Sequence, residues 1–526
     1  MARSVLIFGL FLAPFARGTA QQGLPRLWSV DDRVILSDFS TITSVAAGPD
    51  RVVVTSPTSL VIWEPLVRRW KGPFDPPDPS YLSGVFASLL DPLDYSVWLA
   101  SHNGWSRYDT NIDAWDRGLI PARVLTIAFD RANPGRGLFF RTSGGWFEVE
   151  RGSMIAAPSS GPLDPEVPKT VQDVLRENPW FEANQAAVLR TARLGTARYT
   201  VAARSFDRQG WYIGTSGAGL LYAEEGAAIP TPLSFGLPSE RVGAVFDGPG
   251  GVWVATDRTV SSEATITFVD RRLTEFKPLD ESAVFGVRFN QATRMVGRDA
   301  FLWVASDLGV VRVGTDGRSA DVVDESRGLP DRHILSLAAR RGTIAVGTAR
   351  GLAVITDSLE VRRVAPDFAG RAFAVAIGGD TLWVGTGLGV FLALPESGDL
   401  ERPVGLGPEP SLRQPVVDLD WLADTLVALT PDHLMWRDPI TGVWTLGPLL
   451  SPQLGRLRTL LPDRGGMWIA GDRGVGAATL ATPSPRTLLV GRDLPAEVTD
   501  LAVDDEFLWV ATMRGLVRWR LEAVRP

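Results

Sequence analysis

The chain of 526 residues contains no cysteine and only three histidines, and only three of its basic residues are lysines. Without cysteine it can form neither a disulfide nor a thiolate metal site. Its formal charge of −7 gives no basic surface with which to displace counterions from phosphates, so we discount DNA and RNA as partners. After the first twenty residues, no apolar run is long enough to span a bilayer.

The first twenty residues have the pattern of an export signal. Arg3 precedes an apolar core from Val5 to Phe15, and small residues follow at Gly18, Thr19 and Ala20. The apolar core is about eleven residues long, whereas a spanning helix needs about twenty. We therefore expect cleavage after Ala20, no membrane insertion afterwards, and a bacterial periplasmic or secreted protein that is stabilised by packing alone.

One short phrase recurs throughout the chain, for example as Leu302-Trp303-Val304-Ala305-Ser306 and Leu508-Trp509-Val510-Ala511-Thr512. The last residue of each copy is here called its anchor. The eleven anchors are Thr55, Ser101, Thr142, Thr215, Thr256, Ser306, Thr348, Thr386, Thr430, Gly471 and Thr512. Successive steps are 46, 41, 73, 41, 50, 42, 38, 44, 41 and 41 residues, close to the 40–45 of a four-stranded propeller blade.

Each repeat alternates short apolar runs with Gly, Pro and Asp, which predicts short antiparallel strands. We therefore predict an all-β protein, a β-propeller of about eleven four-stranded repeats with a short helical insert. Repeats 1–3 would occupy residues 21–160, the insert 161–195 and repeats 4–11 residues 196–526. We expect the phrase tryptophans to fill the spaces between blades; they are Trp98, Trp253, Trp303, Trp383, Trp468 and Trp509.

The two ends of the chain complement each other. The last repeat stops after the strand 516–520 and lacks a fourth strand, whereas residues 24–30 form an extra strand before the first repeat. Pairing the two would close a ring and remove exposed strand edges. Because eleven blades exceed the usual four to eight, we favour two juxtaposed rings of five and six blades. A single ring of eleven is the alternative.

The repeats also carry a family resemblance. Gly236-Leu237-Pro238, Gly328-Leu329-Pro330 and Asp493-Leu494-Pro495 each lead into a strand, then the tryptophan strand, then a Gly-Leu strand. This resembles the two-component regulator propeller repeat, found in the periplasmic sensor halves of bacterial hybrid histidine kinases that respond to glycan fragments. It is also similar to repeats in a propeller subunit of the type IX secretion apparatus.

The resemblance implies a non-catalytic, sensor-like module that binds a glycan or another small ligand. The chain departs from the sensors in having no immunoglobulin-like domain, membrane helix or kinase, and from the secretion subunit in having no sorting domain. We therefore expect another protein to relay any signal. The alternative function is a protein-interaction scaffold in a cell-envelope or secretion assembly, with an envelope protein as the partner.

The loops just past the anchors are the first candidate binding surface, because ring symmetry would bring them to one face. Their polar residues are His102, Asn103, Asp257, Arg258, Asp307, Arg350, Asp472, Arg473 and Arg514. Arginine forks bind carboxylates in two-point fashion, which suits an acidic or hydroxyl-rich ligand. The alternative is that neighbouring Asp and Arg side chains form solvated pairs of little energetic value.

The long 73-residue step holds the second candidate. Residues 163–194 have the spacing of two short helices broken at Asn178-Pro179, and we expect them to emerge on the same face as the anchor loops. The insert is either a cap packed on a blade or a lid over a ligand. As a lid, it would present Trp180 and Phe181 to the ligand.

Residues for catalysis are sparse. His102, His333 and His433 lie in different repeats, and none has metal-type spacing with another histidine. The Ser-x-Asp-x-Gly-x-x-Trp box of sialidases is absent. Paired acids such as Asp418 and Asp420 are too common in blade loops to nominate a general acid and base. We expect no catalytic residue, no metal and no cofactor.

Overall fold

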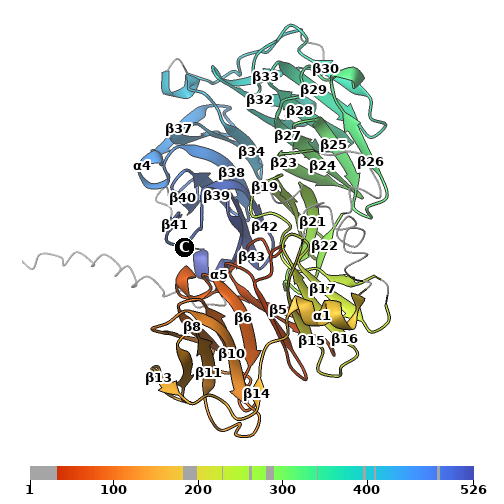
Figure 1. Cartoon of the computed structure of the whole chain (residues 1–526). Coiled ribbons are helices and arrows are strands. Elements are labelled where there is room, and N and C mark those ends of the chain that lie inside the picture. The colour runs from red at the N-terminus through yellow and green to blue at the C-terminus, as the bar shows by residue number, and fades with distance from the viewer. Residues whose placement is uncertain are drawn as a thin grey trace, which may run out of the picture.

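The computed structural model describes residues 32–179, 181, 198–227, 229–259, 264–279, 289–340, 342–394, 398–407, 410–481 and 486–525. These form eleven antiparallel sheets, of which nine have four strands, one has five and one has three (Figure 1). The predicted all-β propeller with eleven repeats is confirmed. The export signal 1–20 and the segment 24–30 lie outside the described residues.

Seven sheets form a closed ring. Their innermost strands contact one another in the order β19, β23, β27, β31, β34, β38 and β42, and β42 contacts β19 again. The strands of the ring are β19 (Val242–Gly248), β20 (Gly251–Thr256), β21 (Thr265–Asp270), β22 (Phe276–Pro278), β23 (Ala292–Arg298), β24 (Phe301–Ser306), β25 (Gly309–Gly314), β26 (Ala320–Val323), β27 (Ile334–Arg340), β28 (Thr343–Thr348), β29 (Gly351–Thr356), β30 (Val361–Val364), β31 (Ala374–Gly378), β32 (Thr381–Thr386), β33 (Gly389–Ala393), β34 (Asp418–Leu422), β35 (Thr425–Leu429), β36 (His433–Arg437), β37 (Trp444–Leu449), β38 (Leu457–Asp463), β39 (Gly466–Gly471), β40 (Gly474–Ala478), β41 (Arg486–Leu489), β42 (Val498–Val503), β43 (Phe507–Thr512) and β44 (Gly515–Arg520). Its short helices are η3 (Glu325–Arg327), η4 (Pro410–Arg413), α4 (Ser451–Leu454) and α5 (Leu521–Val524).

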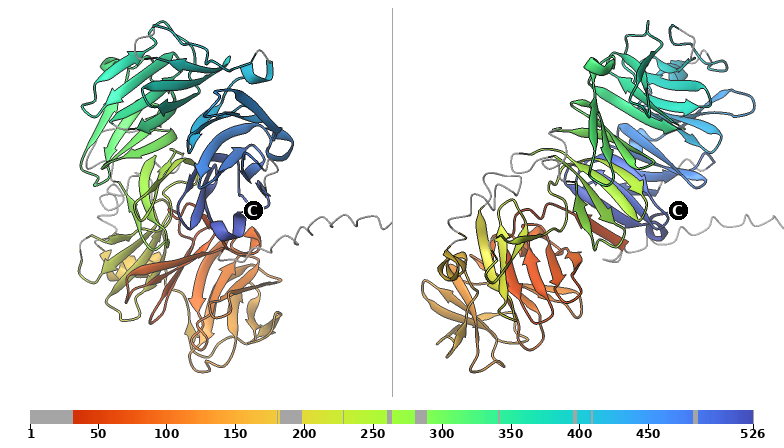
Figure 2. Two further views of the ribbon diagram at one scale, coloured as in Figure 1. Left: turned by 180° about the vertical axis from the view of Figure 1, so that it is seen from behind. Right: turned by 90° about the vertical axis from the view of Figure 1, so that its right-hand side faces the viewer.

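The other four sheets form an arc beside the ring (Figure 2), with innermost strands in the order β15, β2, β6 and β10. Its strands are β2 (Ser44–Ala47), β3 (Val52–Thr55), β4 (Leu60–Glu64), β5 (Arg69–Phe74), β6 (Val85–Leu90), β7 (Val97–Ser101), β8 (Gly104–Asp109), β9 (Ala114–Leu119), β10 (Val124–Asp130), β11 (Leu138–Thr142), β12 (Gly145–Val149), β13 (Ala156–Ser159), β14 (Pro165–Glu166), β15 (Tyr199–Arg204), β16 (Gly210–Thr215), β17 (Leu220–Glu224) and β18 (Thr231–Leu233), with the short helix η2 (Pro79–Tyr81) after β5. The blades therefore divide into seven and four, not into the five and six favoured from the sequence.

The first strand among the described residues closes the ring. β1 (Arg33–Leu36) pairs antiparallel with β44, so that Leu36 lies opposite Leu516, and the last blade has four strands. An N-terminal strand thus closes the ring with residues 33–36, whereas the predicted segment 24–30 lies outside the described residues. The chain thus leaves the ring after β1, builds the four-blade arc, and returns at β19.

The insert spans the two end blades of the arc. At its start, β14 pairs with the inner edge of β10, and helix α1 (Val171–Glu177) then packs on β15. Thr170 and Asp173 form a capping box that fixes the start of this helix. The expected break of the helix at Asn178 is confirmed, because the helix ends there.

Apolar clusters lie between neighbouring blades and contain the phrase tryptophans, as expected. Trp253, for example, packs with Leu302 and Val304 of the next blade, and Trp303 packs with Leu337 and Val346 of the one after. All six phrase tryptophans are buried. The side chains thus hold each blade to its neighbour, which explains why a single repeat is not a stable unit. No helix in the described ranges is long and apolar enough to cross a membrane.

The anchor residue has a local role in most blades, although Gly471 has no hydroxyl and the Thr55 hydroxyl instead contacts those of Thr43 and Ser44. In the other blades the anchor hydroxyl donates to a backbone carbonyl beyond the following turn, as from Thr348 Oγ1 to Gly351 at 2.9 Å and from Thr512 Oγ1 to Gly515 at 2.7 Å. Both hydroxyls are buried, so the bond satisfies a carbonyl at the tightest point of the turn.

We expect Thr348→Val to lower the free energy of unfolding by about 1 kcal/mol, because the isosteric side chain leaves that carbonyl with one partner fewer. Urea unfolding followed by tryptophan fluorescence measures the change. Thr381→Val is the matched control, because no hydrogen bond of its hydroxyl is found among the described residues. An equal loss in both variants would contradict this role for the anchor.

Candidate functional site: the axial channel of the seven-blade ring

The axis of the seven-blade ring is a channel with a cavity of about 660 Å³, lined by all seven innermost strands. Its mouth lies at the hairpins between first and second strands, where Asp247, Gly379, Asp424 and Val503 border it. The anchors lie at the opposite end of each blade, because Thr256 pairs with Val242 at the start of β19. The volume is in the range of ligand pockets, which is about 300–1,000 Å³.

One layer of residues lies across the channel at the end opposite the hairpins, towards the anchors. In each of the seven blades it is the residue twelve positions before the anchor: Ala244, Arg294, Ser336, Ala374, Asp418, Thr459 and Asp500. Strand register confirms that these positions are equivalent, since each pairs with the residue just before its anchor. We call this set the upper layer.

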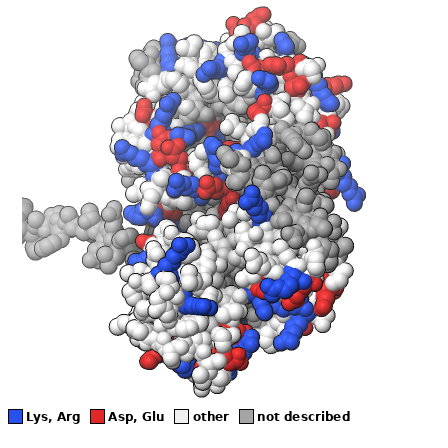
Figure 3. All heavy atoms as spheres, in the orientation of Figure 1, with Lys and Arg blue, Asp and Glu red and all other residues white. Residues whose placement is uncertain are grey.

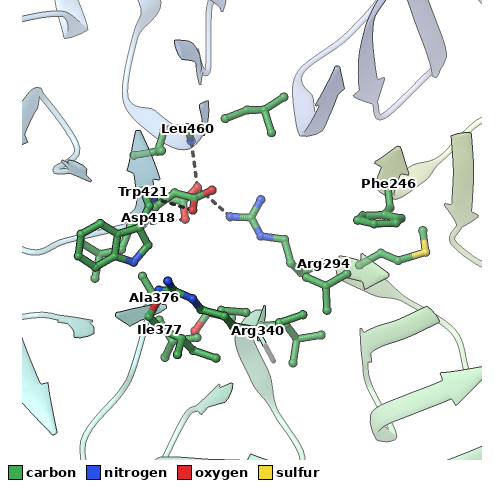
Figure 4. Close-up of a pocket in the computed structure, with 18 of the residues that line it drawn as sticks. Phe246, Arg294, Arg340, Ala376, Ile377, Asp418, Trp421 and Leu460 are labelled. Carbon is green, nitrogen blue, oxygen red and sulfur yellow. Dashed lines mark hydrogen bonds and ion pairs between the residues drawn. The ribbon is translucent and has the colours of Figure 1, made fainter. Parts of the chain in front are cut away.

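Arg294 links the upper layer across the lumen (Figure 4). From β23 it donates to Asp418 of β34 at 2.7 Å and to Asp500 of β42 at 2.9 Å. It also donates to Thr459 Oγ1 at 2.9 Å, and that hydroxyl donates to Asp418 at 2.7 Å. One guanidinium thus ties together four blades that are not all neighbours.

Backbone groups complete this network. The amide of Leu460 donates to Asp418 at 2.9 Å, and the amide of Val245 donates to Asp500 at 3.0 Å. Asp418 raises the pKa of Arg294 the most, with a further contribution from Asp500. Burial raises the pKa of Asp500, and Arg294 opposes that shift. The arginine therefore stays charged and neutralises acids that are almost fully buried.

A lower layer lies two residues further along each first strand, ten positions before the anchor. It consists of Phe246, Val296, Ala338, Ala376, Asp420, Leu461 and Ala502. Six of the seven are apolar, and Asp420 is exposed within the channel. Desolvation by the surrounding channel walls and the nearby Asp418 raise the pKa of Asp420 to about 6, although Arg294 acts in the opposite direction.

Two larger side chains shape the way to the mouth. Arg340 of β27 donates to the carbonyl of Ile377 at 2.6 Å. Trp421 of β34 packs on Gly378, where an added Cβ would come within 2.5 Å of its Cζ2 atom. At the mouth, burial and Asp504 raise the pKa of Asp247 to about 6, whereas Arg271 lowers it. The cavity thus extends from the Arg294 network of the upper layer towards the hairpins between first and second strands.

The residues expected to bind from the anchor loops lie away from this mouth. Asp257, Arg258, Asp307, Arg350, Asp472, Arg473 and Arg514 belong to blades of the ring, whereas His102 and Asn103 belong to the arc, so the structure does not gather all nine around one axis. Several link loops: Arg258 donates to Asn290 at 3.2 Å, and the Asn290 amide donates to Asp307 at 2.8 Å. His102 stacks on Phe86, with ring centroids 4.8 Å apart.

Other members of that set also have protein partners. Asp257 accepts from the amide of Ala292 in the next blade at 3.0 Å. Arg350 lies 3.5 Å from Asp331, and Asp472 accepts from Arg458 at 2.5 Å. Arg473 donates to the carbonyl of Pro452 at 3.4 Å, and Arg514 is exposed. These contacts give most of the set a role in holding loops together.

The described part of the insert packs on a blade as a cap. Phe181 is only 1% exposed and packs with Val174, Trp211 and Ile213 against the blade that starts at β15. It is therefore not presented to a ligand, which corrects the expectation for this residue. Trp180 lies outside the described residues.

Within the described ranges, no group of three or more His, Asp or Glu residues is arranged to hold a metal ion. The expectation that the protein uses no metal or cofactor stays a prediction. The chemistry that the channel offers is ionic and apolar contact.

Comparison with known proteins gives a likeness in fold. No protein-family model matches the chain, and no curated protein matches it. Among solved structures, an extracellular domain from B. thetaiotaomicron, described as part of a hybrid two-component system, aligns with 91% of this chain and 70% of its own length, at 10% identity and a TM-score of 0.41. An inactive variant of virginiamycin B lyase from Staphylococcus aureus aligns with 54% of this chain and 97% of its own, at 15% identity and a TM-score of 0.44. The Pan2 WD40 domain of Neurospora crassa aligns with 53% of this chain and 89% of its own, at 10% identity and a TM-score of 0.39. These values agree with a propeller and carry no argument about function.

Proposed function

We propose that this protein is an exported, sensor-like propeller that binds a small ligand in the axial channel of its seven-blade ring. The observation that carries the proposal is the cavity of about 660 Å³, which all seven blades line. Membership of the two-component regulator propeller family, indicated by the repeats, is part of the same proposal. A partner protein would then relay the state of the pocket.

Binding rather than catalysis is favoured by the chemistry of the lining. The upper-layer acids share Arg294, and none of the described residues that line the channel is a histidine, lysine or cysteine. Paired acids can act as acid and base only when one is held protonated near the reacting atoms. Asp418 instead accepts four hydrogen bonds, from Arg294, Thr459, Leu460 and Leu419.

The test is to capture the ligand. Purified protein is incubated with an extract of its native envelope and washed, and the molecules released on denaturation are identified by mass spectrometry. We expect Ala338→Phe, which adds a ring to the lower layer, to lose the bound molecule, with affinity falling by about tenfold or more. Leu388→Phe, at an exposed anchor loop, is the matched control and should retain it.

Retention of the same molecule by Ala338→Phe, in a variant whose thermal unfolding is unchanged, would overturn the assignment of the site. Recovery of a protein partner and of no small molecule would favour the scaffold function instead. Identification of the released molecule also tests whether it is a glycan, which the resemblance implies.

A further inference from the structure

The lower layer of the channel holds one charged group in an otherwise apolar ring. Phe246, Val296, Ala338, Ala376, Leu461 and Ala502 occupy the positions equivalent to Asp420 in the other six blades. No ion pair of Asp420 is found among the described residues, and its Oδ1 accepts only the amide of Trp421, at 2.7 Å. The carboxylate is therefore accessible in the channel without a cation.

Neither of the two arginines that line the channel forms an ion pair with Asp420. Arg294 is committed to Asp418 and Asp500 in the upper layer, at 2.7 and 2.9 Å. Arg340 donates to the carbonyl of Ile377. Two arginines and five aspartates line the channel, the aspartates being Asp247, Asp418, Asp420, Asp424 and Asp500, which gives the lining a formal charge of −3.

This excess is local. On the face shown in Figure 3, acidic and basic side chains are interspersed and do not gather by sign. A cavity with low-dielectric walls and one sign of charge concentrates ions of the opposite sign. The walls also include the rings of Phe246 and Trp421, which lie on different sides of the pocket in Figure 4. Such rings suit the apolar body of a ligand and attract a cation to their faces.

We infer that the ligand of the channel carries a cationic group, of the ammonium or guanidinium type, which ion-pairs with Asp420 while its apolar body lies against Phe246 and Trp421. The inference rests on the proposed function, because it takes the channel as the binding site. It adds the chemical class of the ligand and the residue that selects it.

The titration of Asp420 supports this assignment. Its pKa of about 6 reflects burial and Asp418, opposed by Arg294. The other charged groups facing the lumen are Asp500 and, nearer the mouth, Arg340, Asp247 and Asp424. A cation favours the ionised carboxylate, so binding should be strongest above pH 6 and weaken as the pH falls through 6 and Asp420 takes up a proton.

The fold itself gains nothing from this carboxylate. An acid whose pKa is raised in the folded state lowers stability as the pH rises from its ordinary value of 3.8 to its folded pKa of about 6, and the loss is complete above that pKa because ionisation is easier in the unfolded chain. Asp420→Asn should therefore raise stability slightly at pH 8, by under about 1 kcal/mol because Asp420 is solvent-accessible, and should have less effect at pH 5. A polar group that lowers stability is typical of a functional site.

Three probes of similar shape and different charge test the inference: phenethylammonium, 2-phenylethanol and phenylacetate. Isothermal titration at pH 8 compares wild type with Asp420→Asn, with Ala338→Phe and with Asp357→Asn, the last being a carboxylate on an outer turn. We expect phenethylammonium to bind wild type at least about tenfold more tightly than either other probe. We also expect a loss of about tenfold or more in Asp420→Asn, and none in Asp357→Asn.

Equal or tighter binding of the alcohol or the acid, unchanged binding of the amine to Asp420→Asn, or no binding of the amine up to about 10 mM would overturn the cationic class. If the alcohol or the acid binds and Ala338→Phe abolishes that binding, the channel remains the site and only the class is wrong. If a bound probe is unaffected by Ala338→Phe, the proposed function fails as well.

Discussion

A chain that begins at Ser37, and so lacks β1, is expected to lose about 5–10 kcal/mol of stability, the scale of the whole stability of a typical domain. β1 supplies four register pairs to β44 and the fully buried side chain of Leu36. Each lost backbone hydrogen bond costs about 1 kcal/mol, and each buried apolar side chain about 1.5–3 kcal/mol. Without β1, the last blade would present β44 as a bare edge strand, which favours association with other chains.

Size-exclusion chromatography with light scattering and thermal unfolding measure this effect. A chain that begins at Asp32 and keeps Arg33–Leu36 is the matched control, and it should keep the oligomeric state and the unfolding temperature of the full chain. A monomer of unchanged stability without β1 would show that the ring does not depend on this pairing.

Replacing Arg294 by methionine is expected to lower the free energy of unfolding by about 3–5 kcal/mol. The substitution removes the only cation that Asp418 and Asp500 contact among the described residues, and their side chains are only 8% and 3% exposed. Two buried carboxylates would then face each other across the lumen without compensation. Because burial raises the pKa of Asp500, acid discharges this carboxylate, and the loss should be largest at neutral pH and smaller as the pH falls.

The control for the burial of Arg294 is the same substitution at an arginine in an exposed ion pair. Arg464 pairs with Asp505, and the two side chains are 75% and 63% exposed, so Arg464→Met should cost under about 1 kcal/mol. Urea unfolding of both variants gives the difference. Combining Arg294→Met with Asp418→Asn and Asp500→Asn should recover part of the loss, since the buried charges are then gone. Similar small losses for Arg294 and Arg464 would contradict the role of Arg294 as a link between blades.

The blades were predictable because their signals are local. The phrase, its spacing and the alternating runs all lie within some forty residues, and the burial of Trp253 and Trp303 between blades follows from them. The division into seven and four was not predictable in this way. It depends on the contact of β2 in the first repeat with β15 in the fourth repeat, in addition to its contact with β6. Repeat spacing carries no information about such contacts.

The channel was missed for a related reason. Asp418 and Asp420 were interpreted as loop acids, although the alternation of polar and apolar residues from Asp418 to Leu422 marks a strand. Arg294, Asp418 and Asp500 all lie twelve residues before their anchors, a constant offset that is visible in the sequence. The offset alone does not show that these side chains contact each other, because Arg294 pairs with aspartates three and five repeats further along the chain and only the closed ring brings them together. The charged anchor loops were easier to notice, and the structure uses most of them to tie loops together.

The pairing of β1 with β44 also sets an order of events during synthesis. Leu36 is made well before its partner Leu516, because the whole four-blade arc and most of the ring lie between them in the chain. The four-blade arc, which lies between β1 and β19 in the chain, can form while the ring is still incomplete. Because domains form as their residues emerge and distant pairings form slowly, the ring must wait for β44. The axial cavity would then come into being only when β44 has been made and has paired with β1, so a chain interrupted before β44 would lack the proposed binding site.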